Sequence, residues 1–211
     1  MEAAMKTIPY PAPAREIVLD YHGPRWTCAY EVQLLCWLAQ QTKGGILEIG
    51  CNEGRTTREL ALANPHRFVM GVDYTGCDDT LCPEQKREKP HATAVGRHAN
   101  MLANVQVFDT KSAELPRVLP NIRDNQPPIG FIFIDGDHSY RGVKADTLLA
   151  LDIIAGNIAE GAGGGIIAWH DCYDHAPGWV GVKSYLDKEI APKFGGERVE
   201  GTWLAILDLR A

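Results

Sequence analysis

The sequence predicts an α/β fold, a doubly wound and mostly parallel sheet that closes with an antiparallel pair of C-terminal strands. Two observations predict it. Short apolar runs alternate with helical periods along most of the chain. The run at 131–134 has no polar interruption, which is typical of a central parallel strand covered on both faces. Because 211 residues suit one compact unit, we expect a single domain spanning 1–211.

The N-terminal third predicts an arm followed by two strands and two helices. Prolines at 9, 11 and 13 indicate that residues 1–25 form an arm lying on the surface or on a neighbour. From Thr27 a helical period places four apolar residues on one stripe: Val32, Leu35, Cys36 and Ala39. We then expect a strand at 46–49, a helix at 56–63 that stops at Asn64-Pro65, and a strand at 68–72 that ends in Asp73.

The segment 74–101 is polar and irregular, so we interpret it as a lid or an insertion. It contains four residues with zinc-ligand side chains, Cys77, Cys82, His91 and His98, although their spacing matches no standard finger. A zinc site here stays an alternative to a plain substrate-side loop.

The second half continues the alternation. We expect strands at 105–108, 131–134 and 166–169, and a short helix at 115–122. A longer helix has apolar residues at three and four spacing, namely Leu148, Leu151, Ile154 and Ile158. A further helix carries Val182, Tyr185, Leu186 and Ile190, and two strands at 198–199 and 203–209 close the fold.

Composition narrows the range of partners and cellular locations that we expect for the protein. The net charge of -6 gives no electrostatic reason to bind a polyanion, so nucleic acid is disfavoured as a partner. No apolar run approaches the roughly 20 residues that span a bilayer, and residues 1–8 lack the apolar core of a signal peptide, so we expect a cytoplasmic protein. The six scattered cysteines favour reduced thiols over a disulfide framework. The oligomeric state stays open, a homo-oligomer included.

The stretch from Ile46 to Thr57 predicts a nucleoside cradle. Its spacing is Glu-x-Gly-x-x-x-Gly, with Gly50 and Gly54 in the loop, where bare backbone allows a tight turn and a close ligand approach. The carboxylate of Glu48 would repel a pyrophosphate, so a neutral or cationic nucleoside such as S-adenosylmethionine fits better. Asp73, about 20 residues further on, lies where a ribose is held by its two hydroxyls.

The ends of the later strands carry candidate catalytic groups. Asp135 and Asp171 end neighbouring strands, so their carboxylates can converge on one Mg²⁺ or Mn²⁺, with His170 as a nitrogen ligand. His138 is a candidate base for a hydroxyl proton. The alternative is that Asp135 and His138 only cap the helix that starts near Tyr140.

Four segments together resemble class I S-adenosylmethionine-dependent methyltransferases with their Rossmann-like sheet. They are Ile-Leu-Glu-Ile-Gly-Cys-Asn-Glu-Gly at 46–54, Gly-Val-Asp at 71–73, Phe-Ile-Asp-Gly-Asp-His-Ser-Tyr at 133–140 and Gly-Gly-Ile-Ile-Ala-Trp-His-Asp at 164–171. More narrowly, they resemble the branch of macrolide-sugar and aminocoumarin-sugar O-methyltransferases and cephalosporin hydroxylase-like proteins.

The resemblance implies a role for each matched residue. Cofactor contacts fall on Glu48, Gly50, Asn52, Gly54, Asp73, Ser112 and Asp135. Metal binding falls on Asp135 and Asp171, with His138 as base and Asp135 beside it in catalysis. The chain departs from its relatives at Lys111 and at His170, where they carry acidic residues.

We therefore expect methyl transfer from S-adenosylmethionine to a small-molecule hydroxyl, with or without a divalent metal. The alternatives are a non-catalytic S-adenosylmethionine-binding or scaffold protein of the same fold, and a nicotinamide-dependent oxidoreductase, which the glycine spacing disfavours. Trp169, Tyr173 and Trp179 are candidates for stacking the acceptor, although packing is the commoner role of aromatic residues near strand ends.

Overall fold

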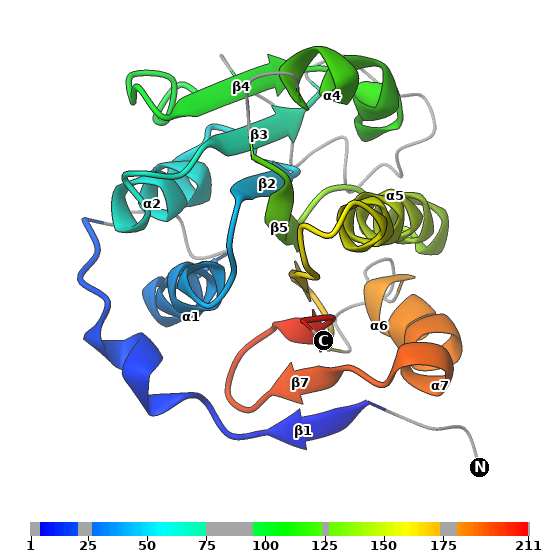
Figure 1. Ribbon diagram of the computed structural model, residues 1–211. Coiled ribbons are helices and arrows are strands. Elements are labelled where there is room, and N and C mark those ends of the chain that lie inside the picture. The colour runs from blue at the N-terminus through cyan, green and yellow to red at the C-terminus, as the bar shows by residue number, and fades with distance from the viewer. Residues whose placement is uncertain (1–4, 21–26, 75–94, 124–126, 174–180, 211) are drawn as a thin grey trace.

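The computed structural model describes residues 5–20, 27–74, 95–123, 127–173 and 181–210. Within these residues the core is one eight-stranded sheet with the order β1-β7-β8-β6-β5-β2-β3-β4 (Figure 1). The strands are β1 (Lys6–Ile8), β2 (Gly45–Ile49), β3 (Val69–Asp73), β4 (Val105–Asp109), β5 (Ile129–Ile134), β6 (Ile166–Trp169), β7 (Glu197–Val199) and β8 (Ala205–Asp208). Every neighbouring pair is parallel except the two that involve β8. The predicted fold class is confirmed, including the antiparallel C-terminal pair.

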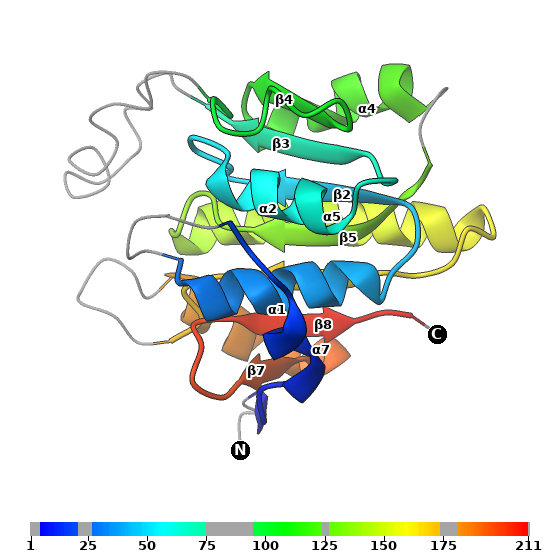
Figure 2. The same cartoon turned by 90° about the vertical axis from the view of Figure 1, so that its left-hand side faces the viewer.

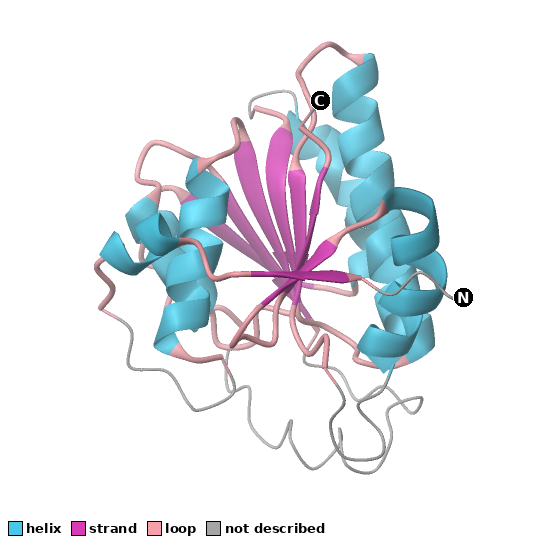
Figure 3. Ribbon diagram, turned by 90° about the horizontal axis from the view of Figure 1, so that it is seen from below, coloured by secondary structure: helices cyan, strands magenta, loops and turns pink. Residues whose placement is uncertain are grey.

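Helices cover both faces of the sheet (Figures 1 and 3). One face carries α1 (Ala29–Gln40) and α2 (Arg55–Ala63), and the other carries α4 (Leu115–Arg123), α5 (Tyr140–Ala159), α6 (Gly181–Tyr185) and α7 (Ala191–Phe194). A π-helical segment, η3 (Leu186–Ile190), joins α6 to α7, and a short 3-10 turn, η2 (Ser112–Glu114), precedes α4. Because strand side chains alternate between faces, Ile46 packs in the core with α1 whereas Leu47 packs in the core with α5.

The centre of the sheet is the place where the winding direction reverses. β2 pairs with β3 on one side and with β5 on the other. The chain builds outward from β2 to β4, then crosses back to β5 and builds in the opposite direction. Ligands of such sheets bind outside the carboxyl ends of the strands at this reversal. The loops that follow β2, β3, β5 and β6 therefore define the candidate site.

The N-terminal arm lies on the chain's own sheet. Residues 6–8 pair in parallel with β7, and the 3-10 turn η1 (Ala12–Glu16) buries Ala14 in the same core cluster as Leu35 of α1. Figure 2 shows this segment running beside α1 to the edge of the sheet. The sequence did not predict β1, because three residues are too few to display a strand period.

One predicted helical stripe is only partly correct. On α5, Ile154 is buried and Leu151 packs partly buried against the core, but Leu148 is 49% exposed and Ile158 is 52% exposed. The buried face also carries polar residues such as Thr147. Because polar residues occupy part of this face, the apolar positions alone do not define it.

Two expectations from composition have partial answers. Cys28, Cys36, Cys51 and Cys172 are free thiols, and Cys77 and Cys82 lie outside the described residues. In the described part of the chain, no helix combines the length and the apolar character that crossing a bilayer requires.

Candidate functional site

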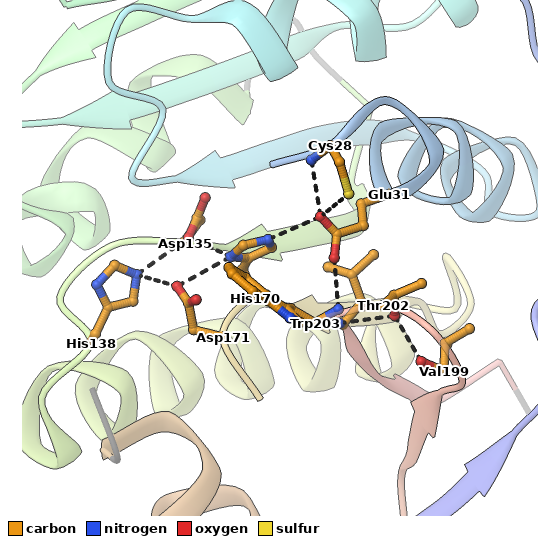
Figure 4. A network of polar contacts seen from close by, with 10 residues as sticks. Cys28, Glu31, Asp135, His138, His170, Asp171, Val199, Thr202 and Trp203 are labelled. Carbon is orange, nitrogen blue, oxygen red and sulfur yellow. Dashed lines mark hydrogen bonds and ion pairs between the residues drawn. The ribbon is translucent and has the colours of Figure 1, made fainter. Parts of the chain in front are cut away.

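The structure brings Asp135, His138, His170 and Asp171 together at the ends of two neighbouring strands (Figure 4). His138 Nε2 lies 3.3 Å from Asp135 Oδ1 and 2.9 Å from Asp171 Oδ2. His170 Nδ1 lies 3.1 Å from Asp171 Oδ2 and 3.6 Å from Asp135 Oδ1. The four side chains that sequence reasoning singled out here form one cluster.

The two carboxylates determine the charge of His138. Burial alone would lower the pKa of this imidazole, but the hydrogen bonds and charges of Asp135 and Asp171 outweigh burial and raise the pKa to about 10. In the absence of another cation, His138 is therefore an imidazolium at neutral pH. It can accept a proton only after releasing the one it holds.

His170 is enclosed more completely, and its second ring nitrogen contacts a residue that sequence reasoning missed. Its Nε2 lies 3.4 Å from Glu31 Oε2, and the exposed fractions of the two side chains are 3% and 2%. Burial would lower the pKa of His170, but the carboxylates of Asp135, Asp171 and Glu31 together raise it well above its usual value.

Glu31 is the third residue of α1, in the position that completes a capping box. Its Oε2 accepts from the backbone N–H of Cys28 at 3.0 Å and from the Cys28 thiol at 2.8 Å, while Oε1 accepts from the backbone N–H of Trp203 at 2.6 Å. A signal was present in the sequence, because Glu31 lies one helical turn before Leu35 on the apolar stripe. A charged residue on a buried stripe needs partners.

Asp171 reaches its partners through an unusual backbone conformation. Its φ is +56°, in the left-handed region that few residues other than glycine adopt and that aspartate tolerates better than most. Burial would raise the pKa of the Asp171 carboxyl, but hydrogen bonds from His138 and His170 lower it. The carboxylate is therefore ionised at neutral pH.

The glycine loop after β2 packs against protein backbone. Gly50 has φ +91°, and a Cβ there would lie 2.2 Å from the carbonyl oxygen of Asp135. Gly54 has φ +79° at the start of α2, where a Cβ would lie 2.8 Å from the Cα of Gly96. The turn and the close approach of neighbouring backbone therefore require glycine at both positions, and the contact of either glycine with a cofactor stays a prediction.

Asp73 and Asn52 are joined across the ends of β3 and β2. The backbone N–H of Asn52 donates to Asp73 Oδ2 at 2.6 Å, and the backbone N–H of Tyr74 donates to Oδ1 at 2.6 Å. Asn52 has φ +46° and is exposed. These bonds fix the orientation of the Asp73 carboxylate beside the glycine loop.

Glu48, predicted as a cofactor contact, lies beneath the loop. Its side chain is 2% exposed and accepts a hydrogen bond from the hydroxyl of Thr57 on α2. Burial, opposed in part by this hydrogen bond, raises the pKa of Glu48 to about 8. In this position the side chain ties β2 to α2, and its contact with a cofactor stays a prediction.

Ser112 lies in the turn after β4, and its hydroxyl donates to Asp146 Oδ1 at 2.5 Å. Asp146 belongs to α5, is 4% exposed, and has its pKa raised to about 6 by burial. A Cβ on Gly136 would lie 3.1 Å from Asp146 Oδ2. Ser112 is thus linked through Asp146 to the loop that begins at Asp135.

The capping alternative for the loop after β5 is wrong. The residue that caps α5 is Ser139, whose hydroxyl accepts from the backbone N–H of Gly142 at 3.0 Å. Asp137 supports this cap, because its carboxylate accepts from the Ser139 backbone and hydroxyl. Asp135 and His138 point instead to the cluster at the strand ends (Figure 4).

The aromatic residues near the site differ from the expected set. Trp169 is fully buried and donates its indole N–H to Thr147, so it is a core residue and cannot stack an acceptor. Tyr173 is half-buried beneath the guanidinium of Arg198, and Trp179 lies outside the described residues. Sequence reasoning missed Trp203, which is 40% exposed with its ring centroid 5.9 Å from that of His170.

Most of the segment 74–101, predicted as a lid or an insertion, lies outside the described residues. Three of the four candidate zinc ligands, Cys77, Cys82 and His91, also lie outside them. The described end of the segment packs on the glycine loop. The backbone N–H of Gly96 donates to Asn52 at 2.8 Å, and that of His98 donates to Glu53 at 2.9 Å. The His98 imidazole lies 3.3 Å from the Glu53 carboxylate.

The donor set at the strand ends fits a metal ion. One ligand atom from each of Asp135, His170 and Asp171 lies within 4.8 Å of the others. Two carboxylates and one imidazole are a set that binds divalent ions in proteins.

A comparison with protein families identifies the class. Residues 47–172 match a family model described as a methyltransferase domain, and the chain belongs to that family. The resemblance to class I methyltransferases is thereby confirmed. The matched range contains the glycine loop, Asp73 and the whole Asp135 to Asp171 cluster.

Solved structures show the same fold at low sequence identity. CalS11, a TDP-rhamnose 3'-O-methyltransferase of calicheamicin biosynthesis, is 15% identical with a TM-score of 0.55, covering 92% of this chain and 90% of its own. Cofactor-bound Rv0187 from MTB is 20% identical with a TM-score of 0.52, covering 94% and 87%. The SAH-bound methyltransferase PaMTH1 of Podospora anserina is 15% identical with a TM-score of 0.52, covering 88% and 80%. No curated protein matches the sequence.

The burial of Glu48 predicts a pH-dependent stability. Its pKa is about 8 in the folded chain against an ordinary value of 4.5, so between these values the folded state holds a proton that the unfolded state has lost. The contribution of Glu48 to the free energy of unfolding therefore falls as pH rises from 4.5 to 8. We expect Glu48→Gln to gain stability relative to the native chain across this range, measured by urea unfolding at pH 5, 6, 7 and 8. Unfolding curves whose separation does not change with pH would contradict this assignment.

Proposed function

We propose that the chain transfers a methyl group from S-adenosylmethionine to a hydroxyl oxygen of a small-molecule acceptor. The observation that carries the proposal is the contact between the glycine loop after β2 and Asp135 after β5, at one edge of the sheet. The glycine loop, with Asp73 beside it, packs backbone to backbone against Asp135 through Gly50. Asp135 in turn lies against His138. A donor on the loop and an acceptor at the cluster would therefore be neighbours.

The donor side is supported by the loop and by Asp73. When bound, S-adenosylmethionine supplies a methyl group on a sulfonium, which an acceptor oxygen attacks in line while the departing sulfur keeps the electron pair. The Asp73 carboxylate, oriented by the N–H groups of Asn52 and Tyr74, is suited to accept hydrogen bonds from the two ribose hydroxyls. The loop holds the donor in register with the acceptor, and positioning of this kind accounts for much of the rate of a displacement reaction.

The acceptor side needs a group that takes the hydroxyl proton. His138 Nε2 faces the two carboxylates, which stabilise the imidazolium once the proton has been transferred. A divalent ion on Asp135, His170 and Asp171 would balance these carboxylates in place of the His138 proton and would lower the pKa of an acceptor hydroxyl bound to it. His138 would then be neutral in the free site and ready to act as the base.

The exposed ring of Trp203 supports an acceptor that contains a ring. It stands edge-on to His170, with an angle of 61° between the ring planes, and its backbone is fixed by Glu31. A sugar or an aromatic ring packed on Trp203 would lie next to the cluster. Among the structurally similar proteins, CalS11 is a TDP-rhamnose 3'-O-methyltransferase, in keeping with such an acceptor.

The donor site is tested by calorimetry. The native chain should bind S-adenosylmethionine and S-adenosylhomocysteine, and Asp73→Ala should weaken both by about 10- to 100-fold, because two hydrogen bonds to a charged group are lost. Asp109→Ala is the matched control, since Asp109 ends the neighbouring strand in register with Asp73. No binding to the native chain at millimolar ligand, or equal losses in both variants, would contradict the donor site.

The base is tested by the formation of S-adenosylhomocysteine with a panel of hydroxyl-bearing sugars and phenols. His138→Gln should lower kcat by about 10²- to 10⁴-fold and leave the affinity for S-adenosylmethionine unchanged, because only the proton acceptor is removed. His66→Gln, at an exposed position ahead of β3, serves as the control. Donor binding without turnover across the panel would favour the non-catalytic alternative, and full activity of His138→Gln would exclude this residue as the base.

The acceptor surface is tested by the KM for the best acceptor in the panel. Trp203→Ala should raise that KM by about 10-fold while Trp203→Phe restores most of it, since the loss is of ring packing. Phe194→Ala is the control, because Phe194 is an exposed aromatic residue at the end of α7. An unchanged KM in Trp203→Ala would place the acceptor elsewhere.

A further inference from the structure

The buried carboxylate of Glu31 lies outside the cluster and contacts His170 at Nε2, the ring nitrogen that does not face Asp135 and Asp171. Glu31 is 1% exposed, and its two oxygens are engaged by Cys28, Trp203 and His170, which belong to three separate parts of the chain (Figure 4). The ring of Phe133 stands perpendicular to the His170 ring, with centroids 6.4 Å apart. The imidazole of His170 is therefore held in one orientation.

This orientation determines which nitrogen faces the site. With Nε2 directed at Glu31, Nδ1 faces Asp135 and Asp171. An imidazole that donates Nε2–H to a carboxylate presents its lone pair on Nδ1. Histidines that bind metals are commonly oriented by a carboxylate in this way.

The distances around Nδ1 are close to those between neighbouring ligands of one ion. Bonds of about 2.1 Å from a metal to nitrogen and oxygen place adjacent ligand atoms about 3.0–3.4 Å apart at angles between 90° and tetrahedral. The separation from Nδ1 to Asp171, 3.1 Å, lies in this range, and the separation to Asp135, 3.6 Å, is slightly longer. The Asp135 side chain is 20% exposed, which leaves a side of the site open to water or substrate.

We propose that Glu31 is a positioning residue that presents His170 Nδ1 as a nitrogen ligand, so that the site binds a late first-row transition ion such as Co²⁺ or Zn²⁺ in preference to Mg²⁺. Magnesium demands oxygen ligands in near-ideal octahedral geometry, whereas imidazole suits the later transition ions. The inference rests on the proposed function for the location of the site, and it deepens that function by naming the class of ion.

Cobalt provides a readout that is independent of activity. Co²⁺ titrated into the full, chelator-treated chain should produce visible absorption bands that saturate with one ion per chain, and a 1,000-fold excess of Mg²⁺ should not remove them. Absence of bands, or their loss at comparable concentrations of Mg²⁺, would overturn the proposal.

Variants assign the effect to Glu31. Glu31→Gln should weaken Co²⁺ binding by about 10- to 100-fold, the usual loss when the partner of a metal-binding histidine is removed, with S-adenosylmethionine affinity unchanged. Glu59→Gln is the matched control, because Glu59 is an equally buried glutamate that pairs with Arg58 on α2. Unchanged Co²⁺ affinity in Glu31→Gln, or an equal loss in Glu59→Gln, would overturn the role of Glu31.

A second variant covers the case in which Glu31→Gln does not fold, since Glu31 also holds Cys28 and Trp203. His170→Gln keeps a polar side chain but lacks the ring nitrogen, so it should lose the Co²⁺ bands and the preference over Mg²⁺. Retention of both would overturn the proposal. Formation of S-adenosylhomocysteine is followed in the same samples. Cobalt bound through His170 without methyl transfer contradicts only the proposed function, and methyl transfer without His170-dependent cobalt bands contradicts only this inference.

Discussion

The candidate site depends on a close approach of two backbones at the centre of the sheet. Gly50 follows β2 directly and lies so near to Asp135 that a single added methyl group would lie 2.2 Å from the Asp135 carbonyl oxygen. Because β2 and β5 are hydrogen-bonded neighbours, this contact has little freedom to relax. It fixes the loop that would hold a methyl donor relative to the carboxylate that organises the acceptor side. The two halves of the site are thus joined by the sheet itself, without any contact from a mobile side chain.

Charge is the second constraint on the site. Three carboxylates, those of Glu31, Asp135 and Asp171, surround two histidines, and both histidines have a pKa raised above the usual value. The structure balances this negative charge with protons on imidazoles. A metal ion would supply the same positive charge while leaving His138 able to accept a proton. The same residues can therefore have their negative charge balanced either by protonated histidines or by a bound metal ion.

Much of the fold could be predicted from the sequence because its strands are short apolar runs whose order follows the chain. The strand ends were equally readable, since Asp73 and Asp135 each follow an apolar run directly and Asp171 comes one residue after another such run. The failures have physical reasons. β1 has only three residues, α5 buries polar residues that interrupt its stripe, and Trp169 uses its indole N–H inside the core. Glu31 was missed because it lies 104 positions before Asp135 in the chain and reaches the site only through the packing of α1 on the sheet.

In the proposed function, the methyl donor and the base share one edge of the sheet. A crystal structure with S-adenosylmethionine bound tests this arrangement most directly. We expect the ribose on Asp73, the donor along the Gly50 to Gly54 loop, and the sulfonium methyl directed toward the space between Asp135 and His138. Density for the cofactor elsewhere, or a methyl group directed away from His138, would contradict the arrangement.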